Sequence, residues 1–318
     1  MRVLVSGGAG FIGSHIADLM LGDGHEVGVL DNLSTGKREN VAKATRLFHV
    51  DLRDRDAVFR VVSEFKPELV SHQAAQASVA VSVRDPLLDA SVNVLGGLNL
   101  LDACTKQGGV QRVVFASTGG AIYGEVPEGT RATEASSPNP FSPYAIHKLA
   151  FEQLLAVYRR ERGLTTSTLR YANVYGPRQD PHGEAGVVAI FIGSLLDGKP
   201  LRVNARKQVG DDGCVRDYVY VGDVARANAL ALRGEIQENV LNVGTGQETT
   251  TRALALAVSR VAGREANLVA GDYRAGDLER SVLDSSKLSR YLPELVGLER
   301  GLALTYEHMA QSGSTRPA

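Results

Sequence analysis

The sequence of 318 residues contains few cysteines, little net charge and no long apolar run. Its two cysteines, Cys104 and Cys214, show neither CxxC nor Cys/His spacing, which argues against a metal site and indicates a reducing compartment. A formal net charge of -1 without a basic block suggests neither nucleic acid nor an anionic membrane surface as a partner. No apolar stretch reaches the roughly 18 residues of a membrane span, and no secretion signal precedes the first Gly-rich turn. A cytoplasmic enzyme or binding protein is therefore expected.

Apolar runs of strand length alternate with segments of helical period from Arg2 to Thr118. The strand-like runs are RVLVS, HEVGVLD, LFHVD, ELVSHQA and VVFAST. This alternation predicts an α/β fold with a doubly wound parallel sheet of the Rossmann type. The pattern loosens after the strand-like TTSTLRYANVYG. We expect a dinucleotide-binding domain of residues 1–173 and about 217–244, a smaller α/β substrate lobe of about 174–216 and 245–310, and a flexible tail, 311–318.

The motif GGAGFIG, residues 7–13, follows a strand and opens a helix. Its glycines can form a tight turn and let the backbone approach a pyrophosphate at the helix N-terminus. Asp31 ends the next strand, at the position from which an acid grips an adenosine ribose. A carboxylate there disfavours a 2′-phosphate, so the motif favours NAD over NADP, although Lys37 and Arg38 soften that preference.

The next two strands end in residues that can meet the rest of a dinucleotide. Asp51 could reach an adenine amino group with Leu52 beside the ring, but it could equally be the N-cap of a helix. The small Ala74 and Ala75 would let a cofactor lie against the backbone. His72 lies at the end of an apolar strand, which favours a core histidine over a catalytic one.

Hydroxyl side chains end the fifth strand. Ser117 and Thr118 reach the carboxyl edge of the sheet, where ligands of such folds bind. They could equally cap the turn that Gly119 and Gly120 make. The sequence around them does not separate these alternatives.

The stretch SPYAIHK places a tyrosine and a lysine four residues apart at a helix start. Ser142 is a good N-cap and Pro143 suits the first helical position, so Tyr144 and Lys148 are expected one turn apart on one face. A cation about 4 Å from a phenol, at an effective dielectric near 20, lowers its pKa from about 10 to roughly 7. A base near neutral pH could then take a proton from a substrate hydroxyl. The same spacing also arises by chance in many helices.

Seven strings in this order carry a family resemblance: GGAGFIGSH, DNLSTGKREN, STGGAIYGE, SPYAIHK, LRYANVYGPRQ, RDYVYVGDVARA and NVGTG. On these strings the chain resembles the extended short-chain dehydrogenases/reductases, and more narrowly the bacterial UDP-glucose (UDP-galactose) 4-epimerases. The resemblance covers nearly the whole chain. It implies a firmly held NAD, a UDP-hexose substrate inverted at C4 through a transient 4-keto sugar, and catalysis by Thr118, Tyr144 and Lys148.

The residues and the resemblance together predict two sets of binding residues. The cofactor set is Gly7, Gly10, Phe11, Ile12, Gly13, Asp31, Asn32, Ser34, Gly36, Asp51, Leu52, Ala74, Ala75, Gln76, Asn93, Ser117, Tyr144, Lys148 and Tyr171. The substrate set is Gln76, Thr118, Tyr144, Asn173, Gly186, Val187, Val188, Phe191, Arg216, Arg274, Asp277 and Ser281.

Related reactions make different demands on the residues after Thr118. The 4,6-dehydratases and uronate decarboxylases of the family carry an acid there, whereas this chain has Gly119 and Gly120, so both are disfavoured. A cofactor-sensing regulator on the same fold, which need not keep the set Thr118, Tyr144 and Lys148, is also disfavoured.

The sugar is the less certain part of the substrate. The small Ser281 stands where a bulky tyrosine restricts 2-acetamido sugars in the family, so UDP-GlcNAc and UDP-GalNAc are also expected to fit. UDP-glucuronate is a lower-ranked alternative, because a uronate needs a cation for its carboxylate, whereas Asp180 and Glu184 follow Arg178 in the loop GPRQDPHGE. A cation folded inward in the small lobe would reverse that ranking; the candidates are Arg202, Arg206 and Lys207.

The helical stretches VNVLGGLNLLDAC and SPYAIHKLAFEQLL present apolar faces. In the family that the chain resembles, such helices pair across a dimer axis, which implies a homodimer. Burial of these faces within one subunit is the alternative.

Overall fold

The computed structural model describes residues 1–181, 186–274 and 276–313. They form two compact units. Unit 1 contains residues 1–118, 140–170 and 224–241, and unit 2 contains 119–139, 171–223 and the chain from 242 onward. Helix α11, Leu298–Gly313, includes the start of the expected tail, so residues 311–313 are helical. Residues 314–318 and Glu184 lie outside the described residues.

The expected domain boundaries differ from these units in four segments. The sequence assigns residues 119–139, 171–173, 217–223 and 242–244 to the dinucleotide-binding domain, but they group with unit 2. The reason is local pairing: β7, Asn173–Tyr175, pairs with β10, Tyr218–Tyr220, outside the large sheet. The Tyr123 hydroxyl also donates to the Asn242 side chain at 2.8 Å, which joins two of the reassigned segments.

A seven-stranded sheet forms the centre of unit 1, in the order β11-β6-β5-β4-β1-β2-β3. The registers from β3 to β5 are parallel, with Val3 opposite both Val27 and Leu69. The sequence prediction of a doubly wound parallel α/β sheet is confirmed. The strands are β1 Arg2–Ser6, β2 Glu26–Asp31, β3 Arg46–His49, β4 Leu69–His72, β5 Arg112–Thr118, β6 Thr166–Tyr171 and β11 Val240–Val243.

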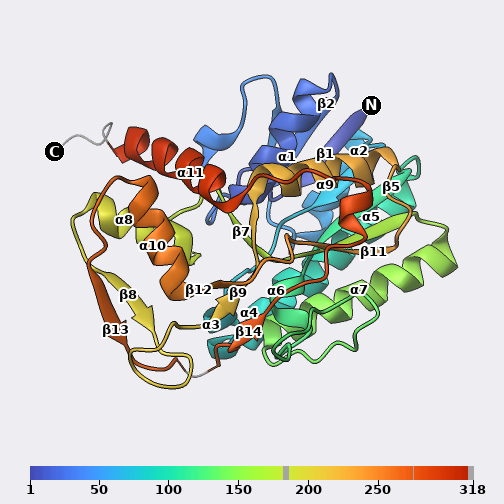
Figure 1. Ribbon diagram of the computed structural model, residues 1–318. Helices are drawn as coiled ribbons and strands as arrows, with labels where there is room; N and C mark the ends of the chain where they lie inside the picture. Colours follow the sequence, from blue (N-terminus) through green and yellow to red (C-terminus); the bar gives the residue numbers. More distant parts are fainter. Residues whose placement is uncertain (182–185, 275, 314–318) are drawn as a thin grey trace. The chain divides into compact units, whose positions relative to one another are not determined.

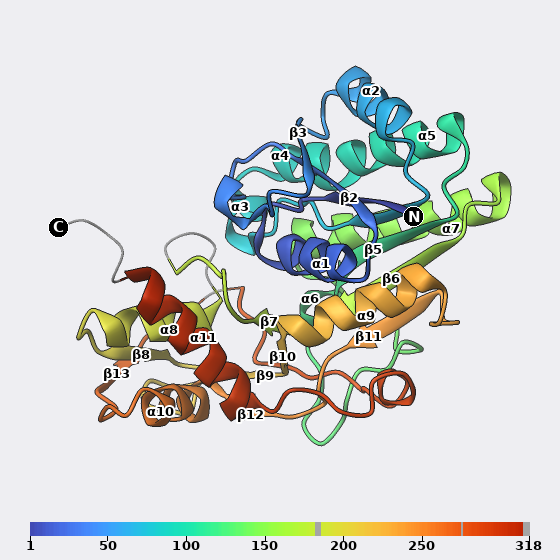
Figure 2. The ribbon, with the colours of Figure 1, turned by 90° about the horizontal axis from the view of Figure 1, so that it is seen from above.

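Helices cover both faces of this sheet (Figure 2). Helices α2, α5 and α7 share one hydrophobic core with the strands, and α1 and α9 lie on the other face. Neighbouring residues of β4 show the alternation: Ser71 contacts Asn228 of α9, whereas His72 packs against Phe151 of α7. These helices are α1 Phe11–Gly22, α2 Arg55–Phe65, α5 Gly97–Gln107, α7 Pro143–Arg162 and α9 Val221–Arg233.

Helix α5 continues a longer helical segment that begins at Pro86. Within the described residues this segment, Pro86–Gln107, is the one helix long and apolar enough to cross a membrane by length and composition. Its face with Leu100 and Leu101 is buried in the core of unit 1, as expected for a core helix of an α/β domain. Its other parts are α4, Pro86–Ala90, and a π-helical turn, η2, Ser91–Gly96; the short α3, Val79–Arg84, and the 3₁₀ turn η1, Arg38–Asn40, complete unit 1.

Unit 2 is a smaller α/β assembly in which α8 and α10 pack on β8 of the β8–β13 pair, and α11 packs on α8 and α10 (Figure 1). A separate three-stranded sheet has the order β12-β9-β14. The elements not yet given are α6 Gly119–Ile122, α8 Val187–Leu196, β8 Leu201–Asn204, β9 Val215–Arg216, β12 Thr249–Thr250, α10 Thr251–Val261, β13 Leu268–Gly271, β14 Arg280–Ser281 and η3 Leu288–Arg290.

A buried ion pair lies between α7 and β6 inside unit 1. Arg170 donates from Nε and Nη2 to the Glu152 carboxylate, at 3.0 and 2.6 Å. The two side chains are 6% and 3% exposed. Glu152 also accepts the Ser117 hydroxyl of β5 at 2.5 Å. This network joins two strands to the helix that carries Tyr144 and Lys148.

Removing one partner of the pair leaves the other charge buried without compensation. We expect Glu152→Ala to lower the free energy of unfolding by about 3–5 kcal/mol, measured by urea denaturation. Asp102→Ala is the surface control, because Asp102 pairs with Lys106 at 2.9 Å where both are partly exposed. Its cost should stay below about 1 kcal/mol. Similar small losses in both variants would show that the buried pair does not stabilise unit 1.

Candidate functional site

The Gly-rich turn packs directly against the end of β4. Gly7 has φ +71°, and a Cβ there would lie 2.5 Å from the Ala74 nitrogen. A Cβ at Gly13 would overlap the Gly7 carbonyl. At the N-cap of α1, Gly10 provides no side chain, and none of the described side chains caps that helix. The first-turn amides therefore remain suited to an anionic group such as a pyrophosphate.

Asp31 lies at the end of β2 beside this turn and is 7% exposed. Its carboxylate accepts the backbone N–H groups of Ala9 at 3.0 Å and Leu33 at 2.8 Å, one on each oxygen. A Cβ at Gly36 would approach it to 2.8 Å, so glycine allows the following loop to fold over it. Each carboxylate oxygen has a second lone pair, which suits two ribose hydroxyls.

The residues after β2 and β3 are linked to one another. Asn32 donates to Asp51 at 2.9 Å and accepts the Ser34 amide and hydroxyl. Hydrogen bonds from the Arg53 side chain hold the pKa of Asp51 well below its usual range. The N-cap of α2 is Asp54, which accepts from the Ala57 amide, so the N-cap alternative for Asp51 is wrong.

Leu52 belongs to the core cluster of unit 1 and is 5% exposed, so little of its side chain faces outward. Contact of Leu52 and Asp51 with an adenine stays a prediction.

Asn93 fixes the segment that follows β4. Its side chain donates to the Gln76 carbonyl at 2.9 Å and accepts the Gln76 amide at 3.0 Å. The Gln76 side chain donates to Asp89 at 2.6 Å and to the Ser78 carbonyl at 2.9 Å. Both hydrogens of its amide group thus have protein partners, and its oxygen accepts the Ser78 amide at 2.6 Å, so the expected ligand contacts of Gln76 are left to the second lone pairs of its side-chain and backbone oxygens.

His72 is confirmed as a core histidine. It is 1% exposed, lies 5.6 Å from the Phe115 ring and 5.5 Å from the Phe151 ring, and shares a hydrogen bond of 2.7 Å with Ser6. Burial, with the nearby charge of Lys148, lowers its pKa to about 3. The ring is therefore neutral at ordinary pH.

The two hydroxyls at the end of β5 have different surroundings. The Ser117 hydroxyl donates into the core, to Glu152, so it does not cap the following glycine turn. The expected cofactor contact of Ser117 is therefore left to its backbone, because its side chain is buried. Thr118, 8% exposed, is the last residue of the strand.

Helix α7 begins as the sequence predicts. Ser142 accepts the Ala145 amide at 3.3 Å, and Pro143 occupies the first turn. Lys148 is 3% exposed; its Nζ donates to the Ala116 carbonyl at 2.9 Å and lies 5.9 Å from the centre of the Tyr144 ring. The structure therefore brings the expected tyrosine and lysine together at the end of β5.

Burial lowers the pKa of Lys148 to about 8. The negative charges of Asp89 and Glu152 act in the opposite direction. Near neutral pH, Lys148 therefore remains mostly an ammonium group. The sequence does not predict a role for either carboxylate, because no local motif marks it.

Part of the expected substrate set meets in unit 2. Ser281 pairs with Arg216 across β14 and β9, and its hydroxyl donates to the Gly120 carbonyl at 3.0 Å. A Cβ at Gly120 would come within 3.7 Å of the Asn173 side chain. Arg216 donates to the Leu278 carbonyl at 2.6 Å, next to the Arg274–Asp277 turn.

Buried charged residues next to these positions were missed by the sequence analysis. Asp217 is fully buried and accepts the Thr245 amide and hydroxyl and the Gly246 amide. Arg280 is 3% exposed and donates to the Val126, Pro127 and Thr130 carbonyls. Each lies one residue from an expected ligand contact, at Arg216 and Ser281, and anchors its backbone.

Three other expected contacts have side chains that are nearly buried. Val188 and Phe191 of α8 are 1% and 2% exposed in the core of unit 2. At this helix start the backbone of residues 186–188 is the part that could meet a nucleotide, and the expected side-chain contact of Phe191 is not supported by its burial. Tyr171 is 5% exposed at the end of β6.

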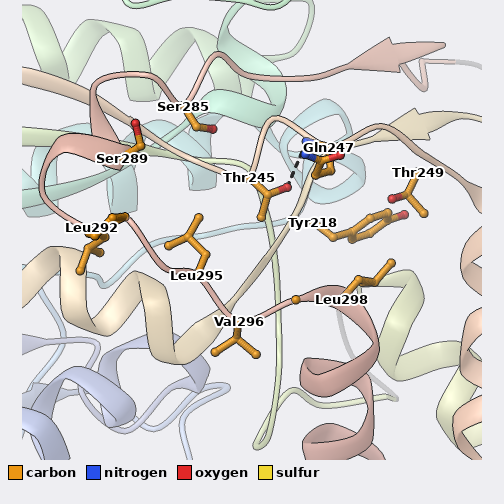
Figure 3. Close-up of a pocket in the computed structure, with 12 residues that line it drawn as sticks. Tyr218, Thr245, Gln247, Thr249, Ser285, Ser289, Leu292, Leu295, Val296 and Leu298 are labelled. Atoms are coloured by element: carbon orange, nitrogen blue, oxygen red, sulfur yellow. Dashed lines mark hydrogen bonds between the residues drawn. The ribbon is translucent and has the colours of Figure 1, made fainter.

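The cavities lined by described residues of unit 2 include one with a mixed polar and apolar lining and one with a charged lining. The cavity in Figure 3, about 300 Å³, has hydroxyl groups such as those of Tyr218 and Thr249 on one wall and aliphatic side chains such as Leu292 and Leu298 on the other. None of the described residues that line it belongs to the expected site. The second cavity has a volume of about 410 Å³. Its lining contains Asp277 of the expected substrate set and several other charged side chains.

Within the described residues, no group of three or more His, Cys, Asp or Glu side chains could hold a metal ion. Cys104 and Cys214 are free thiols.

Comparisons with known proteins agree with this geometry. The family model described as the NAD dependent epimerase/dehydratase family matches residues 3–244. A UDP-glucose 4-epimerase of Thermus thermophilus, solved in complex with NAD, is 60% identical with a TM-score of 0.93, covering 97% of this chain and 98% of that one. A UDP-glucose 4-epimerase of Thermotoga maritima, solved with UDP-glucose, is 46% identical with a TM-score of 0.90, covering 98% and 99%.

A curated relative leads to the same family. The UDP-glucose 4-epimerase of Mycolicibacterium smegmatis is 44% identical over 315 residues, which are 96% of this chain and 98% of that protein. The chain belongs to the NAD dependent epimerase/dehydratase family.

Proposed function

We propose that this protein is an NAD-dependent UDP-hexose 4-epimerase, which interconverts UDP-glucose and UDP-galactose through a transient 4-keto sugar. The observation that carries the proposal is the pair on α7: Tyr144 beside the buried Lys148 ammonium group, at the carboxyl end of β5. Two of the relatives that the chain matches over nearly its whole length are UDP-glucose 4-epimerases, one solved with NAD and one with UDP-glucose.

The residues of unit 1 fit NAD. The N-terminus of α1 offers backbone amides to the pyrophosphate, and Asp31 keeps lone pairs for the adenosine ribose. A 2′-phosphate would meet the Asp31 charge, which favours NAD over NADP. When bound, NAD supplies the reversible acceptor for the hydride of the sugar C4. The backbone after β4, which Asn93 fixes, completes the cofactor side.

Tyr144 serves as the base for the sugar 4-hydroxyl. An ammonium charge near 6 Å from the phenol, at an effective dielectric of about 20, stabilises its phenolate by roughly 3 kcal/mol. Thr118 holds the sugar oxygen from the end of β5. When the hydride returns to the opposite face of C4, Tyr144 gives the proton back to the C4 oxygen. Because both the hydride and the proton return to the sugar, the reaction has no net redox change.

Tyr144→Phe tests this assignment. It removes the proton-accepting oxygen but keeps the ring beside Lys148, so kcat should fall by about a thousandfold or more while NAD stays bound. Proton NMR of UDP-glucose and UDP-galactose measures turnover, and cofactor released on denaturation measures NAD. Tyr158→Phe, a partly buried tyrosine farther along the same helix, is the control. Turnover in Tyr144→Phe close to that of the native protein would show that another group is the base.

Two features disfavour the neighbouring reactions. Gly119 and Gly120 cannot move a proton through a side chain, and the Gly120 carbonyl already accepts from Ser281. A uronate would need a cation, but Arg206 lies 3.6 Å from Glu128 and Lys207 lies 3.6 Å from Glu279.

The third candidate for a uronate, Arg202, lies 3.7 Å from Asp272. All three cations thus have carboxylates nearby. UDP-glucuronate remains the lower-ranked alternative.

The nucleotide part of the substrate is assigned to unit 2. Asn173, Arg216, Arg274 and Asp277 would hold the UDP group while the 4-keto sugar turns over. Arg216 immediately precedes Asp217, and the Asn173 side chain donates to the Asp217 carbonyl at 3.2 Å. Asp217 therefore fixes the position of both residues. A firm grip on the nucleotide is what allows the sugar itself to rotate.

Ser281 sets the sugar that fits. Its side chain is small, so UDP-GlcNAc and UDP-GalNAc should be accepted beside UDP-glucose and UDP-galactose. Ser281→Tyr should lower kcat/KM for the acetamido pair about 100-fold and for the plain pair less than about tenfold, because the added ring competes with the acetamido group. Ser281→Ala is the control and should keep both. If the native protein does not convert UDP-GlcNAc, the predicted specificity is wrong.

A homodimer is the expected assembly. Leu87 of α4, Leu95 of η2, and Ile146 and Val157 of α7 remain 81, 58, 49 and 42% exposed on helices that pack beside one another. Burial within one subunit therefore does not account for them. An apolar face of this kind fits a second copy of the chain. The free cysteines fit a cytoplasmic location.

Leu95→Glu tests the dimer by placing a charge on this face. It should lower the sedimenting mass to that of a monomer of 33.9 kDa, measured by analytical ultracentrifugation. Leu256→Glu, a partly exposed leucine of α10 in unit 2, is the matched control and should keep the dimer. If the native protein sediments as a monomer, this face is not a self-association surface.

A further inference from the structure

Asp89 of α4 is a fully buried carboxylate that the catalytic steps above do not use. Burial of a carboxylate carries a large free-energy cost unless hydrogen bonds and an opposite charge compensate it. Asp89 has both kinds of compensation. Asp89 lies next to α7, the helix that carries Tyr144 and Lys148, and this position indicates the role of its hydrogen bonds and charge.

The two oxygens of Asp89 bridge two parts of unit 1. Oδ2 accepts from the Gln76 side chain at 2.6 Å, in the segment after β4. Oδ1 pairs with Nδ1 of His147 at 2.6 Å, on α7. An ionised carboxylate can only accept, so Nδ1 carries the hydrogen. His147 immediately precedes Lys148, so this carboxylate sets the distance between the cofactor side and the catalytic helix.

The opposite charge is that of Lys148, which follows His147 on α7: the negative charge of Asp89 acts to raise the pKa of Lys148, against the lowering by burial. Of the carboxylates that act on it, Glu152 shares its charge with Arg170, whereas Asp89 is bonded to an amide and an imidazole N–H.

Among the described residues, the other titratable groups near Lys148 include Tyr144 of α7, which shares its face, His147 of α7, whose ring is bonded to Asp89, and His72 of β4, which burial keeps neutral at ordinary pH. Asp89 is thus the main countercharge that remains for the Lys148 ammonium group.

We propose that Asp89 is a positioning residue of the catalytic site, which ties the segment after β4 to α7 and keeps Lys148 as an ammonium group. Two buried opposite charges stabilise each other in a medium of low dielectric. Without the charge of Asp89, the cost of burying Lys148 is less compensated. Lys148 then releases its proton at a lower pH and no longer supports the Tyr144 phenolate. This inference rests on the proposed function only for its kinetic consequence.

Asp89→Asn is the test, because it keeps the size of the side chain and removes its charge. Asp85→Asn is the matched control: Asp85 is the exposed N-cap of the same helix, and asparagine caps equally well. Lysine labelled with ¹³C at Cε, with Lys148→Met for assignment, allows the Lys148 titration to be followed by NMR in the protein with its cofactor. The melting temperature and the NAD content are measured in parallel.

The native Lys148 should titrate at its lowered pKa of about 8. In Asp89→Asn the midpoint should move to lower pH, and in Asp85→Asn it should not. The alkaline limb of kcat should follow the midpoint, so that kcat on that limb falls about tenfold for each pH unit by which the midpoint moves, while KM for UDP-glucose changes little. A merely structural role would lower the melting temperature and leave the Lys148 titration in place.

An unchanged Lys148 midpoint in folded Asp89→Asn would overturn the proposal. If that variant does not fold, Asp89→Ser replaces it, since serine removes the charge and leaves room for a water molecule between Gln76 and His147. If the native protein epimerises no UDP-hexose, the proposed function fails, but the Lys148 titration still decides the role of Asp89.

Discussion

Lys148 is 3% exposed, so the protein must supply most of the hydrogen bonds and the countercharge of its ammonium group. The Ala116 carbonyl accepts from it at 2.9 Å, and the Phe115 ring lies 4.8 Å away. Asp89 and Glu152 supply the negative charge. Strand β5 and helices α4 and α7 must therefore keep fixed positions around one atom. The same arrangement places Tyr144 at the end of the sheet.

Close packing of glycine backbone also keeps parts of unit 1 in fixed positions, on the side where the cofactor is expected. Gly7 touches the end of β4, and Gly97 touches the Phe151 ring, with no room for a Cβ at either. The first contact brings the phosphate-binding turn beside the segment after β4. The second brings the long helix of residues 86–107 against α7. Small residues thus fix distances that a proton and hydride transfer require.

In unit 2, buried charges hold the backbone from which the expected substrate residues extend. Asp217 and Arg280 are nearly inaccessible to water; both bond loop backbone, and Asp217 also accepts the Thr245 hydroxyl while Arg280 pairs with Glu248. Their neighbours Arg216 and Ser281 pair across β9 and β14. A nucleotide grip and a sugar pocket can therefore be precise although the strands that carry them are only two residues long.

The sequence alone determined the parallel sheet, the Gly-rich turn, the position of Asp31 at a strand end and the helix start at Ser142. Each of these depends on residues close together in the chain. It also determined that His72 belongs to the core, because His72 lies at the end of an apolar strand. The tertiary structure decided that Ser117 turns toward Glu152, that Asp54 rather than Asp51 caps α2, and that residues 119–139 join unit 2. The roles of Asp89 and Glu152 depend on contacts with strands and helices that are distant in sequence. The reason is physical: local pattern fixes hydrogen bonds along the chain, whereas burial and countercharge depend on what packs against each residue.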